Sequence, residues 1–448
     1  MKRDIEIDLL RWKNQKHHLP MLIRGARQVG KTYVVERFGK LEFSQCVILN
    51  FERFPELKQC FDSLDPRKII EAIELVTGKT LTPGKALLFL DEIQECPQAI
   101  MALRYFKEEM PELHVIGAGS LLEFVLNDPK FKMPVGRVQF LYLRPLSFGE
   151  YLDAAGHPQL RTHLKTVQIG DSIQLAIHNK LLSLVREYFS LGGMPAVILT
   201  FLESKSFLQT QEMQSAILFS YKKDFGKYAN RTPHHHLENI FSKAPGLVGQ
   251  WLKYSSIDSE TATSTLKIAL RKLTDAGLII PVYATSAAGL PFITHKNEKK
   301  YKLLFLDVGL VKRACNLDLE FFFKENPFLV NKGALAEQFV GEELLAYFGK
   351  NEEGALFSWV REEKSSSAEI DFLVNVDSFM VPIEVKAGAI GTLRSLKLFL
   401  EEKKIALGVR IAENPFSLQS NILSIPFYMI EQLPRLVRAF YENLIPNG

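Results

Sequence analysis

The chain has 448 residues, more than a single domain usually contains, so two to four domains with an ample hydrophobic core are expected. Hydrophobic residues make up 47% and charged residues 24%, a globular composition that excludes a chain disordered throughout. The net charge of +4 is too small for a surface that is basic overall, so any nucleic-acid partner must be met by local patches.

The cysteines and the N-terminal residues predict the compartment. The 4 cysteines form no CxxC pair, which disfavours a zinc ribbon or a disulfide scaffold and fits a reducing cytosol. The opening sequence MKRDIEIDLLRW lacks the apolar core of a signal peptide, and no apolar run approaches the ~18 residues of a membrane span. We therefore expect a cytoplasmic protein with no membrane partner.

Residues 1–150 alternate short apolar runs with helical patterns. The runs are mostly continuous, which is typical of strands that are covered on both faces of a parallel sheet. They comprise Pro20–Arg24, Cys46–Phe51, Ala86–Leu90, His114–Ile116 and Val138–Leu143. Helical spacing is found between them, at Pro66–Val76 and Gln98–Glu109. This series of βαβ units predicts an α/β fold for this domain.

Three further regions are expected. Residues 151–242 are mainly helical, residues 243–325 hold helices and a hairpin, and residues 326–448 form a second α/β domain. The last boundary is placed at the aromatic and polar cluster Glu320–Phe328. The C-terminal domain is expected to open with the helix Gly333–Phe348. Its later elements comprise strands at Phe357–Val360, Ile370–Val374, Val381–Val385 and Leu407–Ile411, and a helix at Leu393–Glu402.

A phosphate-binding loop is predicted at residues 25–32, GARQVGKT, which match G-x-x-x-x-G-K-[ST] in full between a strand and a helix. Its glycines let backbone N–H groups wrap the phosphates of ATP at a helix N-terminus. Lys31 would reach the β- and γ-phosphate oxygens, and Thr32 would present a hydroxyl to Mg²⁺. The expected nucleotide contacts from this segment comprise Gly25, Ala26, Arg27, Gln28, Val29, Gly30, Lys31, Thr32 and Tyr33.

A pair of acids supports this interpretation. The run Ala86–Leu90 delivers Asp91 at the carboxyl end of a strand, where ligands bind in open α/β sheets. Asp91 would hold the Mg²⁺ shell, and Glu92 would polarise the attacking water as a general base. An acidic turn at the end of a strand is the alternative.

Two more residues are candidates for contact with the γ-phosphate. Ser120 ends the sequence HVIGAGS and could act as a sensor, although a solvated serine in a glycine-rich turn fits equally well. Arg137 could reach the nucleotide of a neighbouring subunit in a homo-oligomer, and an exposed loop arginine is the alternative. The strand Cys46–Phe51 is expected to lie between the phosphate-loop strand and the strand that ends at Asp91.

The segments IRGARQVGKT, LLFLDEIQ, GAGS and LRPLSFGEYL resemble the bacterial and archaeal AAA-type ATPases that carry a C-terminal domain of unknown function, DUF4143. The Gly-Gly-x-Pro break of that family is matched by Gly192–Pro195, and its Tyr-x-x-Asp helix by Tyr221–Asp224. The resemblance spans nearly the whole chain. It implies ATP hydrolysis coupled to an undefined partner.

The region 243–325 resembles a winged helix-turn-helix. Leu247–Tyr254 and Thr263–Ala276 are expected helices, and Leu278–Ala284 and Lys300–Leu306 are the expected strands of a wing. Several basic residues would lie on the polar face of the second helix and on the wing. They comprise Lys267, Arg271, Lys272, Lys296, Lys299 and Lys300. They could meet DNA phosphates, whereas a lid, a protein-docking surface and a solvated face are the alternatives.

The C-terminal domain carries a constellation of acids. Asp371 begins one expected strand, and Glu384 and Lys386 share one face of the next, because successive side chains alternate across a strand. With Glu337 from the opening helix, these carboxylates would form a hard-oxygen site for Mg²⁺ or Mn²⁺, and Lys386 could orient or deprotonate a water.

This arrangement resembles the PD-(D/E)xK nuclease fold, which Glu337, Asp371, Glu384 and Lys386 match residue by residue. The proline of that motif is absent, since Ile370 precedes Asp371. The alternative is an ion-pair cluster in an inactive core, in which Lys386 neutralises two acids.

The sequence as a whole predicts an Mg-dependent AAA-type ATPase whose cycle acts on a nuclease-like C-terminal domain, near DNA. The main alternative is a nucleotide-dependent switch whose C-terminal domain binds a protein or a nucleic acid without cleaving it. A transcription regulator that uses the winged helix is a third possibility.

Overall fold

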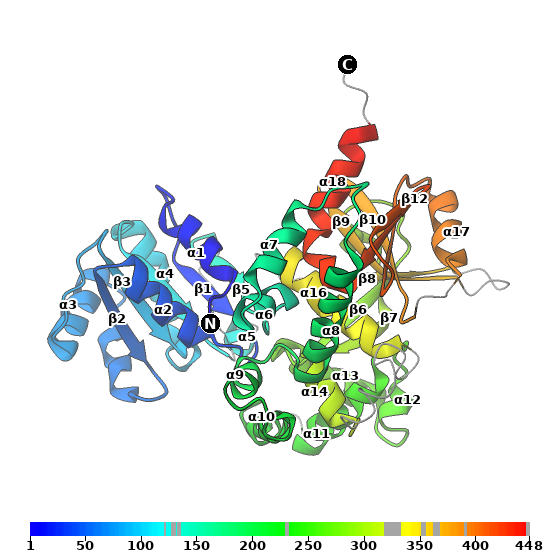
Figure 1. Ribbon diagram of the computed structural model, residues 1–448. Coiled ribbons are helices and arrows are strands. Elements are labelled where there is room, and N and C mark those ends of the chain that lie inside the picture. The colour runs from blue at the N-terminus through cyan, green and yellow to red at the C-terminus, as the bar shows by residue number, and fades with distance from the viewer. Residues whose placement is uncertain are drawn as a thin grey trace. The chain divides into compact units, whose positions relative to one another are not determined.

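The computed structural model describes residues 1–120, 122–126, 131, 136–228, 233–317, 333–350, 355–361, 368–388 and 392–444. These residues form two compact units (Figure 1). The first unit comprises residues 1–144 with two short later segments, and the second comprises most of residues 145–448. The boundary expected at Glu320–Phe328 lies outside the described residues.

A five-stranded sheet forms the centre of the first unit, in the order β2-β3-β4-β1-β5. Its strands are β1 (Met21–Arg24), β2 (Gln45–Asn50), β3 (Ala86–Asp91), β4 (His114–Ala118) and β5 (Gln139–Tyr142). All neighbouring pairs are parallel, and every residue of β3 and β4 is buried. This burial on both faces accounts for the continuous apolar runs, and the predicted α/β fold is confirmed.

The expected position of β2 in the sheet is wrong. β4 lies between β1 and β3, whereas β2 lies at the edge, beyond β3. The burial pattern of β2 is correspondingly mixed. The order of strands in a parallel sheet depends on how the crossovers pack and not on the order of motifs along the chain. As a consequence, Gly119 and Ser120 follow the strand that separates the phosphate loop from Asp91.

The helices of the first unit begin and end where the sequence favours it. They are α1 (Ile5–Lys13), α2 (Lys31–Glu42), α3 (Pro66–Thr77), α4 (Pro97–Glu109) and α5 (Leu122–Leu126). Prolines occupy the first positions of α3 and α4, where the missing N–H breaks no helical hydrogen bond. The Asp65 carboxylate caps α3, and Gly78, with φ of 66°, ends it in a left-handed conformation.

The second unit opens with helices. They are α6 (Phe148–Ala154), α7 (Pro158–Thr166), α8 (Leu175–Leu191), α9 (Pro195–Ser204), α10 (Phe207–Tyr228), α11 (His234–Lys243), α12 (Tyr254–Ile257), α13 (Thr263–Asp275) and α14 (Val308–Ala314). The predicted Gly-Gly-x-Pro break joins α8 to α9. There the backbone N–H of Gly193 donates to the buried Asp307 carboxylate at 2.5 Å, and Asp307 also caps α14 through Leu310. The break therefore fixes two helix ends to one another.

An eight-stranded mixed sheet completes the second unit, in the order β12-β13-β11-β10-β9-β8-β6-β7. Its strands are β6 (Ile279–Thr285), β7 (Lys296–Phe305), β8 (Leu356–Val360), β9 (Glu369–Val376), β10 (Phe379–Val385), β11 (Gly408–Ala412), β12 (Ser417–Gln419) and β13 (Ile422–Pro426). The helices that accompany it are α16 (Ala334–Phe348), α17 (Arg394–Lys403) and α18 (Leu433–Leu444). β9 and β10 pair antiparallel as a hairpin.

The helix expected at Leu247–Tyr254 is wrong. A 3-10 turn, Ala244–Leu247, ends there, and Gly249 adopts φ of 74°, a left-handed conformation that interrupts a helix. Trp251 instead forms an isolated β-bridge with Lys302 of β7. The hairpin β6–β7 is continuous with the C-terminal strands, because β6 pairs in parallel with β8.

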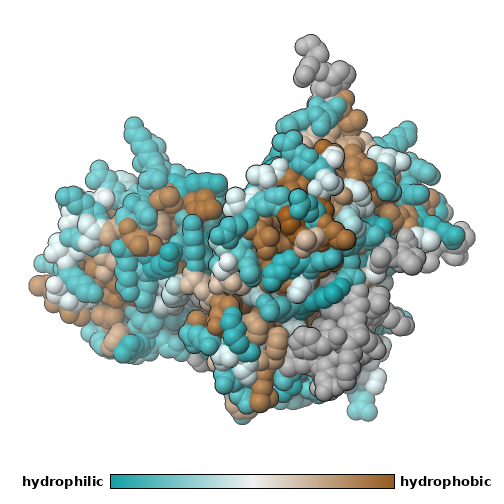
Figure 2. Space-filling model, viewed as in Figure 1, coloured by the Kyte–Doolittle hydropathy of each residue, from teal (hydrophilic) through white to brown (hydrophobic). Residues whose placement is uncertain are grey.

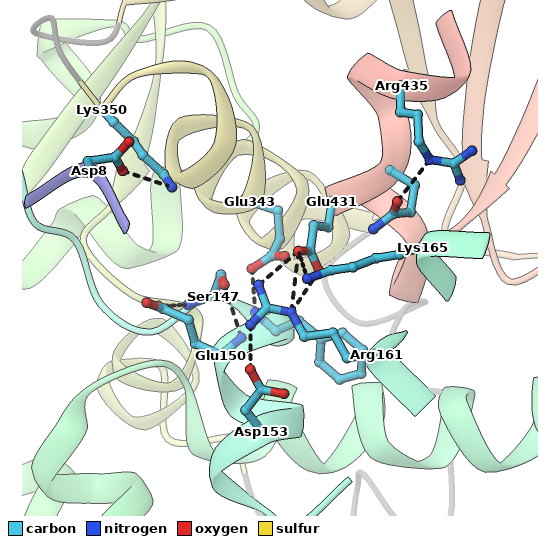
Figure 3. A network of polar contacts seen from close by, with 12 residues as sticks. Asp8, Ser147, Glu150, Asp153, Arg161, Lys165, Glu343, Lys350, Glu431 and Arg435 are labelled. Carbon is cyan, nitrogen blue, oxygen red and sulfur yellow. Dashed lines mark hydrogen bonds and ion pairs between the residues drawn. The ribbon is translucent and has the colours of Figure 1, made fainter. Parts of the chain in front are cut away.

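A buried polar network connects the helices of the second unit to its C-terminal part (Figure 3). The guanidinium of Arg161 pairs with Asp153 at 2.6 Å and with Glu431 at 2.8 Å. Phe148 donates its backbone N–H to the Glu343 carboxylate at 2.8 Å, and burial raises the pKa of Glu343 to about 8. Removing one partner of such a network leaves a buried charge uncompensated, so these contacts hold the helical segment in place.

Hydrophilic residues cover much of the face that is visible in Figure 2, with smaller hydrophobic areas between them. Within the described ranges, no helix is both long enough and apolar enough to span a bilayer.

Candidate functional site

The loop at residues 25–32 joins β1 to α2, and two of its residues adopt positive φ angles, which glycine tolerates better than other residues. Gly25 adopts φ of 145° and Gly30 φ of 94°. A Cβ added at Gly25 would lie 2.1 Å from the backbone oxygen of Leu143, so no side chain fits there. Gly30 precedes the first residue of α2 and has no side chain with which to cap it. The first N–H groups of this helix are therefore suited to a phosphate.

Lys31 lies over its own loop. Its side chain is buried, and its Nζ donates to the backbone oxygens of Gly25 at 2.9 Å and Ala26 at 2.8 Å. Burial lowers the pKa of Lys31 to about 8, although the neighbouring Glu92 and Asp91 oppose this shift. An anion in the loop would compensate the ammonium charge that burial disfavours.

The predicted metal-binding pair is brought together. Thr32 Oγ1 donates to the two Asp91 oxygens at 3.1 and 3.2 Å, and Asn50 Nδ2 donates to Asp91 Oδ2 at 2.7 Å. Burial, followed by the charge of Glu92, raises the pKa of Asp91. A hydroxyl and a carboxylate in contact, with the carboxylate charge disfavoured by its surroundings, fit an Mg²⁺ ion. Asn50 escaped the sequence analysis, although it pairs in register with Asp91 at the end of β2.

Glu92, the predicted base, adopts φ of 49°, a left-handed conformation that is uncommon for a residue with a side chain. Its Oε2 accepts hydrogen bonds from Gln94 Nε2 at 2.7 Å and from Ser120 Oγ at 3.4 Å. Arg27 Nε donates to Ser120 Oγ at 3.2 Å. Ser120 thus links the phosphate loop to Glu92, as its position after β4 allows. Gln94 ends the segment LLFLDEIQ, but the sequence analysis assigned it no role.

Tyr33 and Arg137 take part in other contacts. The Tyr33 hydroxyl accepts a hydrogen bond from the N-terminal amine of Met1 at 2.8 Å. Arg137 Nε donates to Glu108 Oε1 at 3.0 Å, and its side chain is 47% exposed. An exposed arginine is compatible with the expected action on the nucleotide of a neighbouring subunit, and that role stays a prediction.

The acids of the second unit surround Lys302 of β7, a residue that the sequence analysis did not single out. Lys302 is 4% exposed. Its Nζ lies 3.1 Å from Glu337 Oε2 and 3.8 Å from Asp371 Oδ1, and it also pairs with Glu369. Burial followed by the charge of Asp371 raises the pKa of Glu337 to about 8, because Lys302 compensates only part of these two effects.

Glu384 and Lys386 complete this group, which we call the acidic centre: Lys302, Glu337, Glu369, Asp371, Glu384 and Lys386. Lys386 Nζ pairs with Glu384 Oε1 at 2.5 Å, and burial raises the pKa of Glu384 to about 7. The ion-pair alternative therefore describes the contacts, but Lys302 neutralises more of the acids than Lys386 does. Among the described residues, no three His, Cys, Asp or Glu side chains are arranged to hold a metal ion.

Three family models match successive parts of the chain. An AAA domain matches residues 17–152, a domain of unknown function (DUF8612) matches residues 182–320, and a domain of unknown function (DUF4143) matches residues 332–428. No curated protein matches the chain.

Two solved structures show distant similarity to this chain. The Walker-type ATPase PABY2304 of Pyrococcus abyssi is 13% identical over 70% of this chain and 95% of its own, with a TM-score of 0.45. The Aeropyrum pernix ORC2 protein in ADPNP–ADP complexes is 15% identical over 69% of this chain and 90% of its own, with a TM-score of 0.35. The loop, the acids beside it and the matching family model together show that this chain carries a P-loop ATPase domain of the AAA type.

Proposed function

We propose that the first unit binds Mg-ATP in the loop at residues 25–32 and hydrolyses it. The contact between Thr32 and Asp91, directly beside the loop that carries Lys31, is the observation on which this proposal rests. The N–H groups of the loop and Lys31 would hold the phosphates, and Thr32 and Asp91 would hold Mg²⁺. The ion, when bound, would neutralise charge that develops on the phosphates.

Glu92 would polarise the attacking water. Gln94 and Ser120 donate to the same Glu92 oxygen, so they would position this carboxylate. Ser120 would also contact the γ-phosphate, and Arg137 would act on the nucleotide of an adjacent subunit if the protein forms a homo-oligomer.

Replacing Glu92 by glutamine tests this assignment. We expect the variant to bind ATP as the wild type does, because the loop and Lys31 are intact, but to lose at least ~100-fold in turnover, because the amide cannot accept a proton. Phosphate release and binding of a fluorescent ATP analogue measure the two properties. Glu95→Gln is the matched control, since Glu95 forms a surface pair with Lys58 at 3.5 Å. Full turnover in Glu92→Gln would contradict the role of Glu92.

We infer that the second unit binds a partner of the ATPase, and that this partner is DNA. Lys267 and Arg271 are exposed on α13, and Lys299 is exposed on the hairpin β6–β7. Aromatic rings accompany neighbouring cations: Lys267 Nζ lies 5.8 Å from the Tyr254 ring and Lys300 Nζ 5.1 Å from the Trp251 ring. Exposed basic groups suit the phosphates of a polyanion, and the rings beside the lysines help to hold them in place.

Binding without cleavage is the role that we favour for the C-terminal domain, because Lys302 already pairs with three of the acids in its acidic centre. Metal-dependent cleavage by Glu337, Asp371, Glu384 and Lys386 is the rival role. It requires a cation in a place that these ion pairs now fill.

The double variant Lys267→Glu/Lys299→Glu tests DNA binding. We expect duplex DNA to bind at least ~10-fold more weakly, with a shallower dependence on salt, because each lost phosphate contact removes about one released counterion. Fluorescence anisotropy at several salt concentrations measures both effects. Lys79→Glu, an exposed lysine of the first unit, is the control for a change in net charge. Equal affinity of the double variant and the control would refute this surface.

A further inference from the structure

Lys302 is held in the acidic centre by its backbone as well as by its charge. It lies on β7 and forms a β-bridge with Trp251, whose Nε1 donates to Glu369 Oε2 at 3.0 Å. The Trp251 ring also lies 5.5 Å from Lys302 Nζ. The same tryptophan therefore contacts the ammonium group and one of the carboxylates that neutralise it. The position of Lys302 in the acidic centre is therefore fixed by strand pairing as well as by its side-chain contacts.

The neighbouring carboxylates stabilise the charged form of the buried Lys302 side chain. Burial alone would lower the pKa of Lys302, but Glu337, Asp371 and Glu369 together outweigh burial and raise this pKa above its ordinary value. The ammonium group accordingly forms ion pairs with Glu337, Glu369 and Asp371. A second cation that enters the centre would meet this charge at close range in a medium of low dielectric.

The distances show that a metal ion and Lys302 compete for the same oxygens. Mg²⁺ and Mn²⁺ require oxygen ligands at roughly 2.0–2.6 Å. Glu337 Oε2 and Asp371 Oδ1 lie 3.1 and 3.8 Å from Lys302 Nζ, so an ion between these two carboxylates would have to take the place of the ammonium group. The residues of the nuclease-like motif are present, but in this arrangement they do not fit a divalent metal.

Glu384 provides a separate indication that the centre suits a cation. It is 6% exposed, and its Oε2 has no hydrogen-bond partner within the part of the chain that the structure describes. Its other oxygen is paired with Lys386. A buried carboxylate oxygen without a partner is costly, and a positive ion beside it would remove that cost.

We propose that Lys302 is an internal cation that occupies the acidic centre in place of a divalent metal ion, and that removing its charge converts the centre into a metal site. Glu337, Asp371 and Glu384 would be the ligands of that site, and they would have to close on the ion, since no three acids among the described residues are now arranged around one. In the wild-type chain the lysine keeps metal out, which makes the C-terminal domain a binding module as long as Lys302 stays in place. This inference concerns the second unit alone and does not depend on ATP hydrolysis in the first.

Titration with Mn²⁺ in the absence of nucleotide tests the proposal, with bound metal followed by electron paramagnetic resonance. Every protein carries Asp91→Asn, so that the nucleotide site does not contribute ligands. We expect no Mn²⁺ to be detected at the acidic centre of the parent, and Lys302→Met to bind one ion there at least ~10-fold more tightly than the detection limit of the titration. Lys302→Arg, which keeps the charge, should behave as the parent. Lys302→Met/Glu337→Gln should lose the gained affinity.

Two results would overturn the proposal: equal Mn²⁺ affinity of the parent and Lys302→Met, or a folded Lys302→Met variant that binds no ion. Methionine leaves several carboxylates uncompensated, so Lys302→Met could fail to fold in EDTA. Refolding in Mn²⁺ then decides the matter, because recovery of the folded state supports a metal site and failure to recover contradicts it.

Discussion

Replacing Lys31 with alanine is expected to abolish ATP turnover and to weaken nucleotide binding by at least ~100-fold. The Lys31 ammonium lies over the loop that we propose to wrap the phosphates, 2.9 Å from the Gly25 oxygen. Alanine removes the cation that would contact the β- and γ-phosphates, and preorganised charges at such sites contribute ~10²–10³ in rate. Phosphate release and titration with a fluorescent ATP analogue measure the two effects.

Protein stability should not account for this loss. The pKa of Lys31 is lowered to about 8 by burial, so the buried ammonium disfavours the folded state below that pH. Alanine removes this unfavourable charge, and the thermal unfolding midpoint should not fall. Lys40→Ala on the same helix is the control, because Lys40 is exposed and pairs only with Glu36, at 3.6 Å, in the described contacts. Wild-type turnover in Lys31→Ala would eliminate the assigned phosphate site.

Replacing Gly193 with alanine is expected to destabilise the second unit by about 3 kcal/mol or more, in the range of overpacked cores and disrupted buried hydrogen bonds. An added Cβ would lie 2.2 Å from the backbone oxygen of Leu146 and 2.7 Å from the Tyr188 hydroxyl. The backbone cannot simply retreat, because Leu146 donates to the Gly193 oxygen at 2.7 Å and Gly193 donates to Asp307. Urea unfolding followed by circular dichroism measures the change.

Gly226→Ala in α10 provides a matched control. A Cβ at Gly226 meets no atom within 4 Å, so alanine should stabilise the helix by roughly 0.5–1 kcal/mol through its lower conformational entropy in the unfolded chain. An unfolding midpoint of Gly193→Ala equal to that of the wild type would contradict this prediction. It would mean that the backbone near Leu146 shifts to accept the added Cβ, and that steric crowding does not require glycine at position 193.

The local sequence pattern predicted most elements of the fold, because the spacing of apolar residues that distinguishes strands from helices involves residues close together in the chain. The run Ala86–Leu90 predicted β3 because that strand is buried on both faces. The pattern misplaced β2, because strand order depends on crossovers. It also predicted a helix at Leu247–Tyr254, where the positive φ of Gly249 and the bridge from Trp251 to Lys302 determine the path of the chain.

The two sites differ in how far the sequence reveals them. The loop at residues 25–32 is recognisable because phosphate binding requires a fixed local spacing of residues, and Asp91 is recognisable because it ends an apolar strand. Asn50 was missed because its contact with Asp91 comes from the register between two strands. Gln94 was missed because the left-handed turn at Glu92 directs it to that carboxylate.

The amino-acid sequence alone indicated an ATPase, since the loop motif with its lysine and its threonine lies within eight consecutive residues. It also placed acids and a lysine at the spacing of a nuclease-like motif. Only the tertiary structure decided what those acids contact. Lys302 is 35 positions from Glu337 in the chain, and it reaches the acids because β6 and β7 join the C-terminal sheet. Charge compensation between distant strands follows from sheet pairing, which no local pattern encodes.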